Sequence, residues 1–341
     1  MILRENVPLA SLTTLRVGGN ARFVVDCESI EDVGKGLAFA REHGLAWSVL
    51  GEGSNVLAHD GGYEGAVLLM QIPDIVVTER GNEVLLTAGA GVNWDTLVRD
   101  AATRGLWGLE NLAGIPGTVG AAPVQNIGAY GAEVKDTLFE VHAIDAETGE
   151  ACVFGNDACD FGYRDSRFKK QRNLIIVTVS FLLTKDAAPR LEYKDLATAV
   201  AEGVEHTTPG AIGTMVRAIR ACKFPDLAVV GTAGSFFKNP TVSATSFSVL
   251  KERHADLPGF PNNQGVKIPL AFVLDRVLNL RGYTEGNVSL FVHQPLVLVA
   301  TEGATAKEID VFADQIAARV YEEIGVRIER EVQPFPIENN F

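Results

Sequence analysis

Two glycines, Gly51 and Gly53, follow the short apolar segment at residues 47–50, and this arrangement limits the folds that the chain can adopt. Glycines after a strand let successive backbone N–H groups point into one concavity, which can hold an anion. A Rossmann fold needs a third glycine and then a helix, but Val56 stands at that position and Gly61-Gly62 follows. A P-loop needs a Lys-Ser/Thr pair, which the segment lacks. The segment therefore predicts either a phosphate-binding turn of another kind or a tight turn between strands.

A second glycine-rich segment covers residues 115–131 and is almost uncharged. Its small residues let the backbone approach a flat ligand closely, so that N–H and C=O groups can contact the ligand edge. The alternative is a buried irregular connection between elements. Loops of this length are uncommon unless they have a function, so we favour a ligand-binding loop.

Arg164 and Ser235 are two side chains that could take part in a reaction. Arg164 lies in a glycine turn beside an aromatic residue, where an arginine can bind a carboxylate or a phosphate. A surface ion pair with Asp165 is the alternative. Ser235 lies between a glycine turn and two aromatic residues, outside any Gly-x-Ser-x-Gly motif, which excludes the nucleophile elbow of α/β-hydrolases. A structural serine in a turn is the alternative there.

Two carboxylates, Glu329 and Glu331, lie near the C-terminus in a segment, residues 326–332, that is predicted to be a strand. Alternate residues of a strand share one face. If that face is buried, at least one of the carboxylates needs a partner or a raised pKa. A solvated edge strand is the commoner alternative.

The composition excludes several classes of protein. A net charge of −13 argues against general nucleic-acid binding, and an anionic substrate would need local cations. The four cysteines form no C-x-x-C pair and are typical of reduced thiols in a cytoplasmic protein. No apolar run is long enough to span a membrane, and the N-terminus does not resemble a signal peptide. The six histidines show no ligand spacing, so no metal site is expected.

The pattern of apolar residues predicts a mixed α and β chain, and its 341 residues suggest roughly two or three domains. Caps and apolar stripes predict helices at residues 30–43, 94–103, 243–254, 270–280 and 305–324 and one that begins at Pro209. Strands are expected at residues 23–27, 47–50, 66–70, 75–78, 83–88, 141–145, 174–183, 291–300 and 326–332. Gly81-Asn82 is typical of a hairpin turn.

Taken in this order, the five segments resemble those of the UDP-N-acetylenolpyruvoylglucosamine reductase family, from Thr13 to Val332. The resemblance implies an α+β fold, in which a two-part FAD-binding unit of the vanillyl-alcohol oxidase/PCMH type carries a separate α/β substrate-binding domain. The first FAD-binding part would cover residues 1–71. The second would cover residues 72–220 and 326–341, with the last strand returning to it, and the substrate domain would cover residues 221–325.

The same resemblance implies the activity. FAD would mediate the NADPH-dependent reduction of UDP-N-acetylglucosamine enolpyruvate to UDP-N-acetylmuramate, a step of peptidoglycan precursor synthesis. Hydride would pass from flavin N5 to C3, and Ser235 would give a proton to C2. Arg164 and Glu331 would hold the developing enolate charge, with Glu331 as a neutral acid or in a bridging hydrogen bond. NADPH would use the substrate pocket in turn, and no nucleic acid, membrane or obligate protein partner is implied.

The resemblance also assigns binding residues. Contacts with FAD would come from Gly51, Glu52, Gly53, Ser54, Asn55, Val56, Ile115, Pro116, Gly117, Gly120, Ala121, Ala122, Gln125, Asn126, Ile127, Gly128, Ala129, Tyr130 and Arg220. Among these, Arg220 would face the flavin ring. The substrate would be held by Tyr163, Tyr193, Lys223, Asn239 and Gln294. The cations Arg164, Lys223 and Lys238 would make a local positive pocket on an acidic protein.

The chain departs from the family at Gln333, where many relatives carry an arginine. Two other functions stay open at this point. One is an FAD oxidase of the same fold, often with the flavin attached to a histidine, although neither glycine-rich segment contains a histidine. The other is a sugar-nucleotide binding protein without catalysis, which would be colourless when purified.

Overall fold

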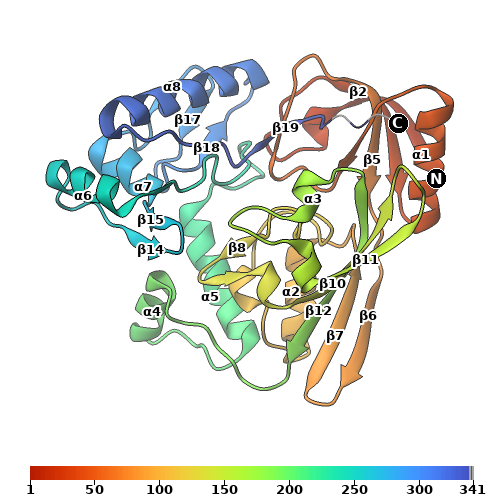
Figure 1. Cartoon of the computed structure of the whole chain (residues 1–341), viewed down its shortest axis with the longest axis horizontal. Coiled ribbons are helices and arrows are strands. Elements are labelled where there is room, and N and C mark those ends of the chain that lie inside the picture. The colour runs from red at the N-terminus through yellow and green to blue at the C-terminus, as the bar shows by residue number, and fades with distance from the viewer. Residues whose placement is uncertain (338, 340–341) are drawn as a thin grey trace.

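The structure is a computed structural model that describes residues 1–337 and 339. Its elements form three groups that follow one another along the chain, and they are seen in Figure 1 as the red-to-brown, orange-to-green and teal-to-blue regions. Within the described residues, no helix is both long enough and apolar enough to cross a lipid bilayer.

The first group is a four-stranded sheet with one helix against it. The strands lie in the order β1-β2-β5-β3, in which β1 and β2 are antiparallel and both β2 and β3 run parallel to β5. Their bounds are Ile2–Pro8 for β1, Asn20–Cys27 for β2, Trp47–Leu50 for β3 and Tyr63–Met70 for β5. Helix α1 (Ile30–Glu42) begins as predicted at Ser29, whose side chain accepts a hydrogen bond from the Asp32 N–H. Its buried residues share a core with those of β2 and β5.

The second group is a five-stranded antiparallel sheet in the order β11-β10-β12-β7-β6. Its strands are β6 (Ile75–Arg80), β7 (Glu83–Gly89), β10 (Leu138–Asp145), β11 (Ala151–Gly155) and β12 (Leu174–Thr184). The predicted hairpin at Gly81-Asn82 is confirmed, because Arg80 pairs with Glu83. Helices α2 (Trp94–Thr103) and α5 (Pro209–Lys223) share one core with this sheet, and Trp94 packs edge-on against Phe181 of β12.

Shorter elements join these two groups to the rest of the chain. They are the strands β4 (Val56–Ala58), β8 (Gly128–Ala129) and β9 (Ala132–Glu133) and the helices α3 (Arg167–Lys170) and α4 (Lys194–Ala201). The strands β8, at the end of the second glycine-rich segment, and β9, directly after it, form a small antiparallel ladder. Most of that segment is otherwise irregular.

The third group packs two small sheets against helices. It comprises β13 (Thr241–Val242), α6 (Ala244–Arg253), β14 (Phe260–Asn262), β15 (Gly265–Lys267), α7 (Leu270–Phe272), β16 (Thr284–Glu285), β17 (Val288–Leu290), β18 (Leu298–Ala300) and α8 (Ala306–Ile324). The predicted capping box of α8 is confirmed, since Thr305 and Glu308 bond each other's backbone. Gly325 ends this helix with φ 68°, a left-handed conformation that favours glycine. The apolar stripe of α8 is buried as expected.

Two expected elements of the third group are shorter or less regular than predicted. The helix predicted over residues 270–280 is only α7 followed by a π-helical turn at Val273–Val277, and Asn279 then leaves the helix with φ 52°. The strand predicted over residues 291–300 is only β18. Turns at Phe291 and Gln294 fold the earlier residues back, and Pro295 has no N–H to give to a ladder.

The C-terminal strand also differs from the prediction. Residues 326–329 are irregular, and the last strand is β19 (Gln333–Phe335), which pairs in parallel with β4. The expected return of residues 326–341 to the second FAD-binding part is therefore wrong, because β4 lies within residues 1–71. Just before β19, Arg330 forms only an isolated antiparallel bridge with Phe237, through backbone bonds from Lys238 to Glu329 and from Glu331 to Phe236. The other domain boundaries stay predictions.

Asp60 connects the first group to the third. Its carboxylate, in the turn after β4, accepts hydrogen bonds from the N–H groups of Ala306 at 2.8 Å and Lys307 at 2.9 Å. A carboxylate at a helix N-terminus is stabilised by the helix dipole and by the unpaired N–H groups. We expect Asp60→Ala to lower the free energy of unfolding by about 1–2 kcal/mol, measured by urea denaturation. Glu64→Ala, at an exposed position nearby, should change it by less than about 0.5 kcal/mol, and equal losses in the two variants would contradict this role for Asp60.

Candidate active site

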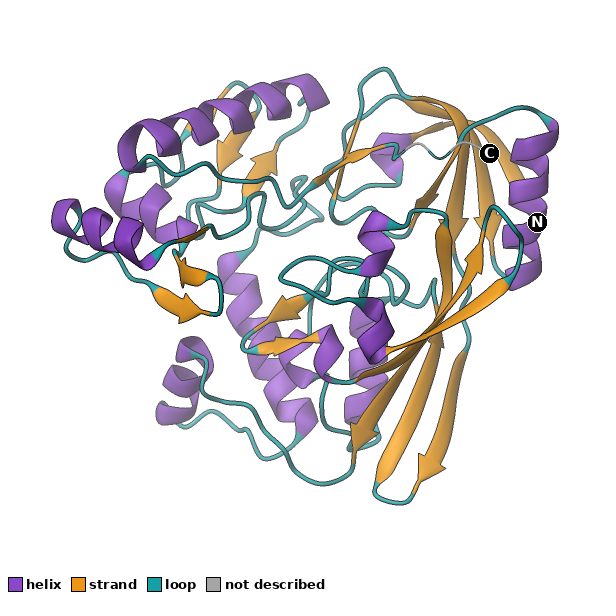
Figure 2. Ribbon diagram, in the orientation of Figure 1, coloured by secondary structure: helices purple, strands orange, loops and turns teal. Residues whose placement is uncertain are grey.

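A cavity of about 1010 Å³ lies where the three groups of elements meet. Its walls contain both glycine-rich segments, which Figure 2 shows as loops near the centre of the molecule. The residues predicted from the sequence that line it are Gly51, Glu52, Gly53, Ser54, Asn55, Val56, Ile115, Pro116, Gly117, Gly120, Ala121, Ala122, Gln125, Ile127, Gly128, Ala129, Tyr130, Arg164, Tyr193, Arg220, Lys223, Ser235, Asn239, Gln294 and Glu331. The fold thus brings together segments that are far apart in the chain.

Three predicted residues, Asn126, Tyr163 and Lys238, lie outside this cavity wall, and Lys238 pairs with the exposed Glu329. Asn126 is fully buried, and its side chain bonds Glu133, the Gly162 carbonyl and the Lys135 N–H. Asn126 therefore stabilises the second glycine-rich segment through protein contacts and does not face the cavity. Tyr163 is 39% exposed, and its hydroxyl lies 3.5 Å from the side-chain nitrogen of Asn239, which does line the cavity.

The backbone after β3 has donors that no described protein group occupies. Within the described part of the chain, the N–H groups of residues 52–55 donate to no protein acceptor. The buried Thr118 hydroxyl likewise has no partner, and a Cβ at Gly51 would lie 2.6 Å from it. Gly53 adopts φ 61°, where a Cβ would lie 2.4 Å from the Leu12 carbonyl oxygen. This stretch can therefore offer unpaired donors to an anion, and side chains other than hydrogen are excluded at both glycines.

Polar side chains hold the two glycine-rich segments together. The carboxylate of Glu52 accepts hydrogen bonds from the Gly117 N–H at 2.8 Å and from the Asn93 side chain at 2.6 Å. Ser54 donates to the Pro116 carbonyl at 3.0 Å, and Asn55 donates to the Gln125 side chain at 2.6 Å. The side chains of Glu52 and Asn55 are thus engaged in joining the segments, which leaves the backbone to face a ligand.

Arg164 and Glu331 form a pair with little solvent access in the cavity wall. The Arg164 Nε donates to Glu331 Oε1 at 2.9 Å, and another guanidinium nitrogen donates to the Gly128 carbonyl at 2.9 Å. Arg164 adopts φ 55°, in the tight turn that the Gly162 and Asp165 backbones close. The alternative ion pair between Arg164 and Asp165 is not formed, since Asp165 pairs with Lys170.

The two predicted carboxylates have different surroundings. Glu331 is buried, and burial raises its pKa, although the charges of Arg164, Lys169 and Lys238 oppose this shift. The side chain of Glu329 is 78% exposed and pairs with Lys238. The expectation that both lie on one face of a strand is not met, because the segment forms only an isolated bridge at Arg330 and the exposure of the two carboxylates differs.

Ser235 lies in the same cavity wall, in the half-buried turn that follows Gly234. Gly234 adopts φ 75°, so the chain can turn sharply just before the serine. Ser235 forms a backbone bridge with Val297, and Phe236 donates its N–H to Leu296. The two phenylalanines that follow, Phe236 and Phe237, are fully buried and fix the turn in the core of the third group.

Lys169 is a cavity residue that the sequence did not single out. Its Nζ donates to the Arg164 carbonyl at 3.0 Å. Burial lowers its pKa, and the nearby charge of Lys238 lowers it further. The sequence shows only that a lysine follows Ser166 by three positions. Whether its side chain points into the cavity depends on how α3 packs, which the sequence does not reveal.

Arg220 and Tyr130 form one side of the cavity. The Arg220 Nε donates to the Gly114 carbonyl at 2.9 Å, and its guanidinium carbon lies 4.5 Å from the centroid of the Phe224 ring. Burial lowers the pKa of Arg220 and raises the pKa of Tyr130 to about 12. Tyr130 therefore keeps its proton at neutral pH.

The predicted substrate residues lie around the cavity mouth. Tyr193 is 45% exposed, precedes α4 and packs edge-on against Tyr130. Lys223 forms an ion pair with Asp195 of α4. Asn239 accepts the Leu270 N–H at 2.8 Å, which leaves its side-chain nitrogen toward Tyr163. No cluster of three or more possible metal ligands occurs among the residues described.

Comparisons with known proteins agree on one family. A model named FAD binding domain matches residues 21–155, and a model named UDP-N-acetylenolpyruvoylglucosamine reductase, C-terminal domain, matches residues 226–335. The UDP-N-acetylenolpyruvoylglucosamine reductase of Bdellovibrio bacteriovorus is 40% identical over 334 residues, which are 97% of this chain and 99% of that protein. The enzyme of the same name from Cupriavidus pinatubonensis is 42% identical over 330 residues, which are 96% of this chain and 97% of that protein.

A solved structure from the same family supports this assignment. The crystal structure of UDP-N-acetylenolpyruvylglucosamine reductase from Thermus caldophilus has a TM-score of 0.66 and 26% identity, and the match covers 98% of this chain and all of that one. An FAD-binding region joined to a separate C-terminal domain is thus confirmed as the architecture. The resemblance stated from the sequence is confirmed, and the chain belongs to the UDP-N-acetylenolpyruvoylglucosamine reductase family.

Proposed function

We propose that this chain reduces UDP-N-acetylglucosamine enolpyruvate to UDP-N-acetylmuramate, with FAD as its cofactor and NADPH as the reductant, in peptidoglycan precursor synthesis. The observation that carries this proposal is the Arg164–Glu331 pair, which shares a cavity wall with Ser235 and with both glycine-rich segments. A cation, a neutral acid and a hydroxyl beside a diphosphate cradle are the groups that such a reduction needs. No histidine is among the described residues that line the cavity, so nothing there favours an oxidase with a histidine-linked flavin.

The unpaired N–H groups of residues 52–55 and the Thr118 hydroxyl would hold the FAD diphosphate, and the segment at residues 115–131 would lie along the flavin ring. Bound FAD supplies the hydride chemistry, from NADPH to C3 of the enolpyruvyl group. Arg220, with guanidinium nitrogens left beyond its bond to Gly114, would place a positive charge beside the ring. NADPH and the enolpyruvyl substrate would use the same pocket in turn.

Three residues of the chain would act on the substrate itself. Arg164 would bind the enolpyruvyl carboxylate, where negative charge develops as C3 gains its hydride. Glu331, whose pKa burial raises, would donate a hydrogen bond as a neutral acid to the same oxygens. Ser235 would give its hydroxyl proton to C2, because a carbanion-like centre is a strong enough base to take it. Tyr163, Tyr193, Lys223, Asn239 and Gln294 would hold the rest of the nucleotide sugar.

A visible spectrum of the purified protein tests this function. We expect a yellow protein that NADPH bleaches without oxygen and that UDP-N-acetylglucosamine enolpyruvate turns yellow again, with one UDP-N-acetylmuramate formed per NADPH. UDP-N-acetylglucosamine, which has no enolpyruvyl group, should leave the bleached protein unchanged. A colourless protein would favour the non-catalytic binding protein, and colour that returns only with oxygen would favour the oxidase.

A further inference from the structure

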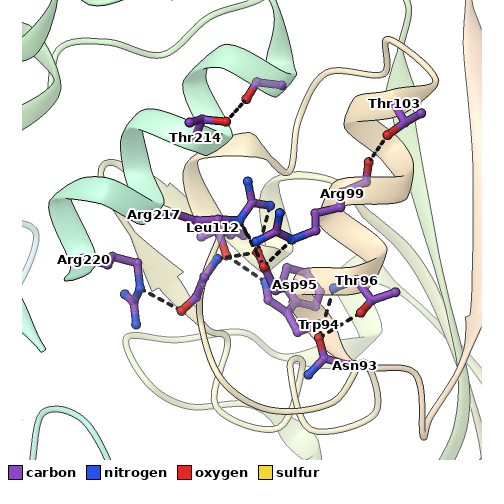
Figure 3. Close-up of polar contacts among 12 residues, drawn as sticks. Asn93, Trp94, Asp95, Thr96, Arg99, Thr103, Leu112, Thr214, Arg217 and Arg220 are labelled. Atoms are coloured by element: carbon purple, nitrogen blue, oxygen red, sulfur yellow. Dashed lines mark hydrogen bonds and ion pairs between the residues drawn. The ribbon is translucent and has the colours of Figure 1, made fainter. Parts of the chain in front are cut away.

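Asp95 lies at the centre of a polar network behind the flavin side of the cavity. It is on α2, and its carboxylate accepts hydrogen bonds from Arg217 of α5 at 2.9 and 3.0 Å and from Arg99 at 2.8 Å. Figure 3 shows Arg217 reaching from α5 toward Asp95, and Arg220 one turn further along the same helix. Asp95 does not line the cavity, so its role must pass through another residue.

The peptide of Gly114 is the link between Asp95 and Arg220. Its N–H donates to Asp95 Oδ1 at 2.6 Å, and its carbonyl accepts from Arg220 Nε at 2.9 Å. One carboxylate therefore fixes the plane of the peptide that orients the guanidinium. Trp94, the residue before Asp95, also donates to the Leu112 carbonyl at 2.9 Å, which holds the same loop against α2.

Gly114 packs against both arginines in a backbone conformation that favours glycine. It adopts φ 69°, and a Cβ there would lie 3.3 Å from Arg217 Cγ, 3.4 Å from Arg220 Cδ and 3.5 Å from Arg220 Nε. The aliphatic parts of the two arginines thus pack directly on the glycine. No other hydrogen bond of the Arg220 guanidinium to the described protein residues occurs, so the Gly114 carbonyl is its polar anchor.

Asp95 is ionised in this network. Burial alone would raise its pKa, but the hydrogen bonds from Arg217, Gly114 and Arg99 bring the pKa below its usual value. The Asp95 carboxylate is paired with Arg217 and Arg99, so its charge is largely balanced within the network. Its bond to the Gly114 peptide distinguishes it from Asp100, the other acid of α2, which pairs with Arg104.

We propose that Asp95 is a positioning residue, which holds Arg220 beside the flavin ring through the Gly114 peptide and thereby raises the reduction potential of the bound flavin. The proposal rests on the proposed function, in which Arg220 faces the ring. A cation held there stabilises the negative charge that the ring gains on reduction. Release of Arg220 would lower the potential.

The midpoint potential of the bound flavin, measured by anaerobic dye titration of the purified holoenzyme, tests this role. We expect Asp95→Ala to shift the equilibrium between oxidised and reduced flavin about tenfold toward the oxidised form, which is about 30 mV for a two-electron couple. Gly114→Ala should shift it in the same direction, because alanine is strained at φ 69° and the peptide that orients Arg220 would have to move. Asp95→Asn should stay close to the unaltered protein, because its amide oxygen can still accept the Gly114 N–H.

Controls separate positioning from charge. If Asp95 acted only through its charge, Asp95→Asn and Asp95→Ala would shift the potential equally and upward, and this result would overturn the proposal. Asp100→Ala, on the same helix and paired with Arg104, should leave the potential unchanged. In an Arg220→Gln background, Asp95→Ala should have no further effect.

The remaining outcomes are also decisive. Loss of FAD from Asp95→Ala, Asp95→Asn and Gly114→Ala, with FAD retained by Arg220→Gln, would show that Asp95 builds the cradle and would overturn the positioning role. A protein that is colourless without any substitution would instead contradict the proposed function. The two failures are therefore distinguishable by the colour of the unaltered protein.

Discussion

Ser235→Ala should leave reduction of the flavin by NADPH unchanged and slow reduction of the enolpyruvyl substrate by about 10²–10⁴-fold, the usual contribution of a positioned proton donor. The reason is that Ser235, in the cavity wall, would act as the proton donor to C2, a step that follows reduction of the flavin. Stopped-flow absorbance at the flavin band measures the two half-reactions separately.

A matched control for this substitution is Ser248→Ala. Ser248 is an exposed serine of α6, and its hydroxyl bonds only the Ala244 carbonyl of the same helix. Both half-reactions should be unchanged in this variant. Equal loss of both half-reactions in Ser235→Ala would show that Ser235 shapes the pocket and is not the proton donor.

The second large effect concerns the protonation of Glu331. Since burial raises its pKa, the neutral acid persists to higher pH than for an exposed glutamate. Reduction of the substrate, which uses the neutral form, should therefore be fastest below this raised pKa and slow as the pH rises through it. Glu331→Gln, which is neutral and can still donate a hydrogen bond, should abolish this pH dependence, whereas Glu331→Ala should lose about 10²–10³-fold in rate at low pH, where the unaltered residue is neutral.

The measurement is the rate of the substrate half-reaction between mildly acidic and alkaline pH. Glu329→Gln is the control, because the Glu329 side chain is 78% exposed and pairs with Lys238 at the surface. This variant should keep the pH dependence of the unaltered protein. A rate of the unaltered protein that increases with pH would contradict a neutral Glu331, since ionisation would then help the reaction.

Elements whose signals are local were predictable. The helix at Trp94–Thr103 has the predicted bounds, and α8 follows its capping box, apolar stripe and C-terminal glycine. A cap and a 3.6-residue stripe act within one helix, so the sequence alone determines them. By contrast, residues 326–332 have strand-like composition, but their backbone bonds go to residues 236–238, far away in the chain. No local pattern reveals such partners.

The candidate site likewise has features that the sequence could predict and features that it could not. The two glycine-rich segments were visible because glycine permits backbone conformations that other residues avoid, and Gly53 indeed adopts φ 61°. The catalytic roles came from the family resemblance, and they stay predictions. The Arg164–Glu331 bond joins residues 167 positions apart, and the sequence could not distinguish it from a pair with Asp165.

Sequence alone thus determined the family, the two glycine-rich segments and the helices that carry their own caps. Only the tertiary structure decided which acid pairs with Arg164, that β19 joins β4, and that Asp95 reaches Arg220 through a single glycine peptide. The physical reason is the sequence distance over which each interaction acts. Backbone preferences and caps act over a few residues, whereas burial, ion pairs and pKa shifts depend on which distant segments the folded chain packs together.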